Sequence, residues 1–200
     1  MLALGIHLCS FNNLIVLHND EKILTTYKWE SFELNKKDQS QVIKRQINLL
    51  LKSQSLELKQ LTEIYYCSGP GAFTALRIVS SFCEALSIGL KIPLTSLPLK
   101  NIIQLAYPNK KVAIPLNQRF FYHKTTNESI DTNLDCLLVS DNNPKMQKTS
   151  EVELLLGTLK TQNWFNEDNF VSAYIQYSNK YIPQDIIYGI EPKIFGKRKT

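Results

Sequence analysis

The sequence predicts an α/β fold of the ribonuclease-H-like, actin-like (ASKHA) class, with two lobes of which the second is reduced. Three short apolar segments separated by turns come first, and helix, strand, helix, strand and helix then alternate. Three antiparallel strands followed by this alternation form the half-unit of that fold. A later hairpin begins the same pattern again. We therefore predict an N-terminal lobe over residues 1–108 and a reduced C-terminal lobe over residues 109–200.

The first three predicted strands cover residues 2–8, 14–18 and 22–29. Asn12-Asn13 and Asn19-Asp20 lie between them and are typical of tight turns. Connections this short join antiparallel neighbours, because a parallel crossover needs a dozen residues or more.

The first long helix is predicted over residues 39–53. Ile43, Ile47, Leu50 and Leu51 recur at helical spacing and form one apolar stripe, which Val42 and Leu49 widen. A surface helix needs one apolar face for its own core. The surplus therefore indicates either a second contact or a deeply packed helix.

A second long helix is predicted over residues 73–90, where Val79, Phe82, Leu86 and Leu90 recur at helical spacing. Several of its other residues are small, which allows a neighbouring backbone to come close. The remaining predicted elements are strands at 61–67 and 92–96, a helix at 98–106, a hairpin of 111–117 and 119–125, a strand at 135–139, helices at 151–161 and 168–181, and a last strand at 186–195.

Composition favours a globular protein in a reducing compartment. Apolar residues make up 44% and charged residues 20% of the 200 residues. None of the four cysteines forms a C-x-x-C pair, and no histidine has zinc-ligand spacing to another ligand. The apolar N-terminal run lacks a basic region and no run approaches about 20 residues, so we expect a cytoplasmic protein without a membrane span.

The most informative segment joins the strand at 61–67 to the second long helix. Gly69, Pro70 and Gly71 end the strand, and Thr74 lies in the first turn of the helix. Glycines allow close backbone approach, and a helix N-terminus attracts anions. The lysine and spacing of a Walker loop are absent. Local chemistry leaves a structural turn and a phosphate site both open.

Residues 69–77, GPGAFTALR, resemble the GPGSFTGLRIG signature of the TsaB (YeaZ) family. Ala72 replaces a serine of that signature, and Ala75 and Val79 replace glycines. The resemblance extends over about residues 2–122 and is poor from 126 to about 180. In that register His7 and Asn117 stand where the family has aspartates, whereas Arg119 and Tyr122 are kept.

The resemblance implies a non-catalytic partner and activator of TsaD in tRNA threonylcarbamoyladenosine (position 37) biosynthesis. TsaD would carry the metal and transfer the threonylcarbamoyl group, and TsaE would supply an ATPase, so this chain would need no cofactor. The two long helices would pair with those of TsaD, or with a second copy, in a four-helix contact, and tRNA would be met only through the complex. The partner-binding residues expected on this basis are Ile43, Ile47, Leu50, Phe73, Arg77 and Ser81.

Two other functions remain open at this stage. One is a degenerate ASKHA-type phosphotransferase or nucleotide-binding protein, which the glycine-bounded helix start favours. Such enzymes hold Mg²⁺ with carboxylates, and His7 and Asn117 provide none. The other is direct tRNA contact through the basic residues between Lys193 and Lys199, for which a solvated tail is the ordinary explanation.

Overall fold

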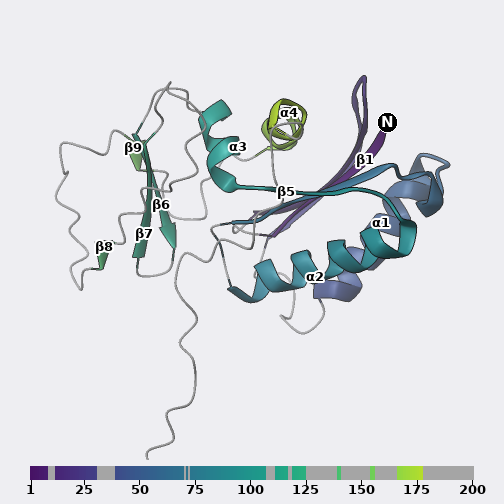
Figure 1. Ribbon diagram of the computed structural model, residues 1–200, viewed down its shortest axis with the longest axis horizontal. Helices are drawn as coiled ribbons and strands as arrows, with labels where there is room; N and C mark the ends of the chain where they lie inside the picture. Colours follow the sequence, from purple (N-terminus) through teal and green to yellow (C-terminus); the bar gives the residue numbers. More distant parts are fainter. Residues whose placement is uncertain are drawn as a thin grey trace, which may run out of the picture.

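A five-stranded mixed sheet forms the centre of the structure, a computed structural model (Figure 1). The structure describes residues 1–8, 12–30, 39–69, 71, 73–106, 111–116, 119–124, 139–140, 154–155 and 166–177. The strands are β1 (Leu2–His7), β2 (Asn12–Asn19), β3 (Ile23–Glu30), β4 (Glu63–Cys67) and β5 (Leu94–Leu97), in the order β3-β2-β1-β4-β5.

The pairing of the strands confirms the predicted fold class. β1 pairs antiparallel with β2, which pairs antiparallel with β3, and on its other side β1 pairs parallel with β4. β4 pairs parallel with β5. Three antiparallel strands extended by two parallel ones give the α/β, ribonuclease-H-like and actin-like sheet that the element order predicted.

Helices cover both faces of this sheet. The helices α1 (Gln39–Ser53) and α2 (Phe73–Leu90) lie on one face, and α3 (Leu99–Ala106) and α4 (Glu167–Tyr177) lie on the other (Figure 1). A short 3₁₀ turn, η1 (Leu58–Gln60), precedes β4. The bounds of α1 and α2 match the predicted ranges, because both helices have a strong apolar periodicity.

The side chains of β1 alternate between the two faces of the sheet, and each face has its own hydrophobic core. Leu4 and Ile6 face the core that α1 and α2 close, together with Ile43, Ile47 and Val79. Ala3 faces the core that α3 and α4 close. Successive side chains of a strand point to opposite faces, so a strand in the middle of such a sheet is apolar on both faces.

An aromatic cluster fills the second core. Tyr65 of β4 stacks on Tyr174 of α4, with ring centroids 3.9 Å apart and planes 9° apart. Phe170 lies 4.9 Å from Tyr65, and His18 contacts both tyrosines edge-on. A Cβ atom at Gly5 would overlap the ring of Tyr65, so only glycine fits beneath it.

The turn between β2 and β3 confirms one predicted turn. The Asn19 side-chain oxygen accepts hydrogen bonds from the backbone N–H groups of Glu21 and Lys22 at 3.0 and 2.8 Å. The prediction of a turn at Asn12-Asn13 is wrong, because both residues already belong to β2 and pair with Glu30 and Trp29.

A second sheet has the order β8-β7-β6-β9. Its hairpin, β6 (Lys111–Leu116) with β7 (Arg119–Lys124), confirms the predicted one. β8 is Val139–Ser140 and β9 is Leu154–Leu155. The predicted helix at 151–161 is wrong at its described residues, because Leu154 and Leu155 pair with β6 as a strand. The predicted strand at 186–195 and most of that at 135–139 lie outside the described residues.

α4 lies late in the sequence but packs on the first sheet. Phe170, Val171, Ala173, Tyr174 and Tyr177 all belong to the core on the α3 side. Lys28 of β3 also pairs with Glu167, with Nζ and Oε2 2.5 Å apart. The division into lobes at residue 108 stays a prediction. Wherever that boundary lies, α4 packs on the first sheet.

We predict that Gly5→Ala destabilises the protein by about 1–3 kcal/mol, the usual cost of forcing an extra carbon into a packed core. Gly89→Ala is the matched control, because nothing lies within 4 Å of the position that its Cβ would occupy. There, alanine should be neutral or stabilise by up to about 1 kcal/mol through its helix propensity. Urea unfolding of both variants measures the difference, and equal effects would contradict the packing described.

We also predict that stability falls below about pH 6.5 because of His18. Its side chain is fully buried and Nδ1 lies 3.1 Å from the Asn19 carbonyl oxygen. Burial lowers the pKa of His18, although the Asn19 carbonyl and Asp20 oppose this. The unfolded chain therefore binds the proton first as the pH falls, and stability is lost at up to about 1.4 kcal/mol per pH unit.

The measurement is the free energy of unfolding of wild type and His18→Gln between pH 7.5 and 5.5. The difference between the two proteins isolates His18 from other titrating groups. Identical pH profiles would show that His18 does not cause the loss.

Candidate functional site

The outer face of α2 is the most unusual surface of the described residues. Only 28% of this 18-residue helix is buried, although it is apolar and long enough, by composition and length alone, to cross a membrane. In this fold it instead connects β4 to β5 and covers the sheet. Phe73 remains 37% exposed and Ile88 77% exposed. Apolar surface is therefore left without cover.

The exposed residues of α2 form one stripe. Phe73, Arg77, Ser81, Ala85 and Ile88 follow one another at intervals of four, four, four and three residues, and all are exposed. This spacing places them on a single face of the helix. We name these five residues the α2 outer stripe.

The guanidinium group of Arg77 lies over the ring of Phe73, 5.4 Å from the ring centroid. A cation in this position is attracted by the face of the ring. The contact holds the two side chains together at the surface, so they form one surface that is apolar at the Phe73 ring and positively charged at Arg77.

Polar contacts fix how α2 sits on the sheet. The Tyr66 hydroxyl of β4 lies 3.3 Å from the Ser80 hydroxyl, and Ser80 donates a hydrogen bond to Oε1 of Glu84 at 2.7 Å. Tyr66 and Ser80 are both buried. They hold the inner face of α2 and thereby orient the α2 outer stripe away from the sheet.

The predicted partner-binding residues divide into two groups. Phe73, Arg77 and Ser81 are exposed and belong to the α2 outer stripe. Ile43, Ile47 and Leu50 of α1 are 0%, 2% and 8% exposed and pack against the sheet. A partner on the outside of α1 cannot reach these three while the core is intact.

Leu49 is the apolar residue of α1 that is open to solvent, with 49% of its surface exposed. The sequence pattern had placed it beside the main stripe, as a residue that widens it. Ile88 and Ala85 were not expected in the site. Their spacing of three to four residues after Ser81 was the signal that could have found them.

The joint before α2 is tied into the sheet by its backbone. Gly69 has φ 102°, a conformation that glycine adopts without strain. Its carbonyl accepts a hydrogen bond from the Leu99 N–H at 2.8 Å, and the Ser68 N–H donates to the Leu97 carbonyl at 3.0 Å. Thr74 is exposed and Gly71 half-buried, whereas Pro70 lies outside the described residues. These bonds couple the start of α2 to β5 and α3.

His7 lies at the end of β1, fully buried, with its ring 6.0 Å from that of Phe170 in an edge contact. This position corresponds to a core histidine. Within the described ranges, no group of three or more His, Cys, Asp or Glu side chains converges as a metal site would require.

The comparisons with known proteins agree with this architecture. A family model described as "TsaD: tRNA N6-adenosine threonylcarbamoyltransferase" matches residues 32–114. The TsaB protein of Buchnera aphidicola subsp. Acyrthosiphon pisum is 42% identical over 50 residues, which are 25% of this chain and 23% of that protein. The TsaB protein of Buchnera aphidicola subsp. Schizaphis graminum is 31% identical over 88 residues, 42% of each chain. The chain thus spans less than half the length of the curated relatives it matches.

Two solved structures share the fold. YeaZ from Pseudomonas aeruginosa superposes with a TM-score of 0.52 at 19% identity, over 63% of this chain and 61% of that one. A protein from the same organism, described as similar to peptidase YeaZ, superposes with a TM-score of 0.52 at 18% identity, over 63% and 60% of the two chains. The chain is therefore similar over part of its length to proteins named TsaB, and it shares the fold of the two solved structures.

Proposed function

We propose that this chain is a non-catalytic subunit of tRNA threonylcarbamoyladenosine biosynthesis that docks on TsaD through α1 and α2. The observation that carries this proposal is the α2 outer stripe, an apolar and small-residue surface on a helix of which only 28% is buried. The relatives named TsaB supply the pathway. The docking mode and the activating role are our inference.

The chemistry of the stripe suits helix-on-helix packing. Ser81 and Ala85 have short side chains in its middle, and larger apolar groups lie at its ends, Phe73 and Ile88. Short side chains let two helix backbones approach, and the flanking large side chains can fill the grooves of a partner helix. Leu49 of α1 adds a further apolar contact. A stable docking of this kind buries about 1,200–2,000 Å² in total.

The same surface would support a homodimer when TsaD is absent, since a two-fold axis brings the same patch of both copies together. TsaE and tRNA would be reached through the complex. Light scattering of the purified chain, alone and with TsaD from the same source, tests both associations. Absence of any complex at micromolar concentrations would overturn the proposal.

A phosphotransferase or nucleotide-binding function is the second candidate, and the glycine joint at the start of α2 is the feature that favours it. Against it, the last residue of β1 is a histidine held in the core instead of a carboxylate that could bind Mg²⁺. Isothermal titration of the isolated chain with Mg-ATP separates the candidates, because the enzyme requires binding and the docking subunit does not. Contact of Lys193–Lys199 with tRNA and the cytoplasmic location remain predictions, and Lys193–Lys199 lie outside the described residues.

We predict that Ser81→Arg weakens the complex with TsaD at least tenfold, because a long charged side chain in the middle of the stripe would separate the two helices. Ser172→Arg is the matched control. Ser172 is an exposed serine on α4, which covers the opposite face of the sheet. Surface plasmon resonance measures both affinities, and equal losses in the two variants would place the interface elsewhere.

A second pair of variants separates core from interface on α1. Ile47→Glu should destabilise the isolated chain by at least about 2–5 kcal/mol, the range for truncating a buried isoleucine, with the cost of a buried charge in addition. Leu49→Glu should leave stability within about 0.5 kcal/mol, since Leu49 is half-exposed, but should weaken the complex. Urea unfolding and binding are measured on both. A Leu49→Glu protein that binds TsaD normally would remove α1 from the proposed interface.

A further inference from the structure

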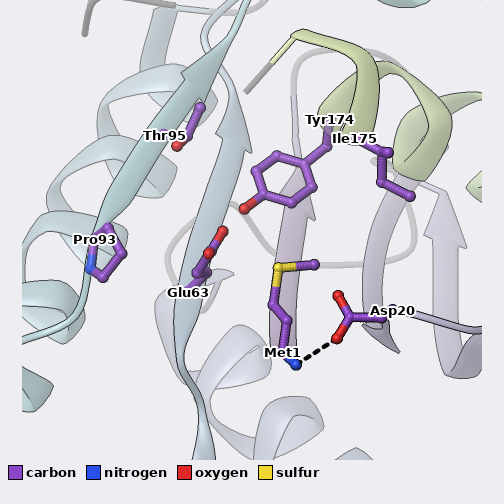
Figure 2. Close-up of a pocket in the computed structure, with 7 residues that line it drawn as sticks. All are labelled: Met1, Asp20, Glu63, Pro93, Thr95, Tyr174 and Ile175. Carbon is purple, nitrogen blue, oxygen red and sulfur yellow. Dashed lines mark hydrogen bonds and ion pairs between the residues drawn. The ribbon is translucent and has the colours of Figure 1, made fainter. Parts of the chain in front are cut away.

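A pocket of about 380 Å³ opens at the edge of the first sheet where its parallel strands begin. It is lined by Met1, Asp20, Glu63, Pro93, Thr95, Tyr174 and Ile175 (Figure 2). Glu63 begins β4, Pro93 and Thr95 lie at the start of β5, and Tyr174 and Ile175 come from α4. Gly69 and the start of α2 lie at the opposite ends of these strands, so this pocket is separate from the site proposed above.

The pocket holds two carboxylates, of which one is already paired. Oδ2 of Asp20 lies 2.6 Å from the Met1 ammonium group. Glu63 is half-buried, and its carboxylate has no ion pair or hydrogen bond within the described residues. Burial raises the pKa of Glu63, which the Met1 ammonium opposes and the Asp20 carboxylate reinforces. The Met1 ammonium group thus pairs directly with Asp20 and acts on Glu63 only at longer range, so the Glu63 carboxylate is left without a direct partner among the described residues.

Tyr174 provides an independent indication of a ligand. Its side chain is only 1% exposed, and its hydroxyl points into the pocket towards Glu63 (Figure 2). The described part of the chain offers this hydroxyl no hydrogen-bond partner, although the ring itself is firmly stacked on Tyr65. The ring is buried, whereas the hydroxyl oxygen reaches the open space of the pocket and is therefore available to a group that enters it.

We propose that this pocket binds an alkylammonium group, held by the Glu63 carboxylate and the hydroxyl groups of Tyr174 and Thr95. An ammonium group has three N–H donors, and these three oxygens are acceptors from three different elements. The apolar side chains of Met1, Pro93 and Ile175 form the wall that the alkyl part would contact. This inference does not depend on the function proposed above.

The test is a titration of the full chain followed by ¹H–¹⁵N NMR, with butylammonium chloride as the probe and 1-butanol as its neutral analogue. We expect butylammonium to shift the amide signals of Thr95, Tyr174 and Ile175 saturably, and butanol to bind at least tenfold more weakly. Equal effects of the two compounds would overturn the proposal, since the charge would then play no part.

Variants assign the contact to Glu63. Glu63→Gln keeps the shape of the side chain and removes the charge, and it should weaken butylammonium binding at least tenfold. Glu21→Gln is the matched control, because Glu21 is exposed in the same turn as Asp20 but does not line the pocket. It should change the affinity less than twofold. Unchanged binding in a folded Glu63→Gln protein would refute the proposal.

Two further measurements complete the design. Thr95→Val removes one hydroxyl and keeps the volume, so it should weaken binding even if Glu63→Gln proves unstable, and an unaffected affinity would count against the site. Nα-acetyl-lysine methylamide then distinguishes the source of the ammonium group. Binding comparable to butylammonium indicates that a lysine side chain of a polypeptide can enter, and binding of butylammonium alone indicates a small free amine.

Discussion

The position of β1 between an antiparallel and a parallel neighbour constrains the first sheet and the helices that cover it. Because both faces of β1 are covered, Ala3 on one side and Leu4 and Ile6 on the other are buried, and the registers of β1 with β2 and β4 cannot shift by one residue. Gly5 shows how tight this constraint is, since the ring of Tyr65 occupies the space of a Cβ atom there. Tyr65 in turn sets the place of α4 through its stack on Tyr174.

The same arrangement explains why the two faces of the sheet differ. The face under α1 and α2 is mainly aliphatic, with Trp29 and Tyr66 among its buried residues, and it is covered by a helix that leaves much of its own apolar surface exposed. The face under α3 and α4 is aromatic and contains the buried His7 and His18. One side of the molecule is thus suited to association, and the other to a rigid interior.

The sequence predicted the elements whose apolar residues recur over a long stretch. It did not predict elements whose conformation depends on pairing with a distant strand. The helices at 39–53 and 73–90 were predicted to the residue, because their apolar residues recur over four or more turns. Leu154-Leu155 was expected in a helix, but pairing with β6 outweighs local propensity there. At the site, periodicity showed a stripe on α1 without showing what it faces. The structure shows that Ile43, Ile47 and Leu50 are core residues. Phe73, Arg77 and Ser81 lie at the surface, as expected of partner-binding residues.

The packing of α4 on the first sheet has a consequence for how the chain acquires its structure. During synthesis β1 to β5 emerge before α4, whose aromatic residues pack on this face and begin about seventy positions after β5. Closing so long a loop is slow compared with forming local helices. Until Phe170 and Tyr174 arrive, Tyr65 and His18 lack the aromatic neighbours that α4 supplies. This face of the first sheet is therefore completed only after α4 has been synthesised, and until then the nascent chain exposes aromatic side chains of β2 and β4.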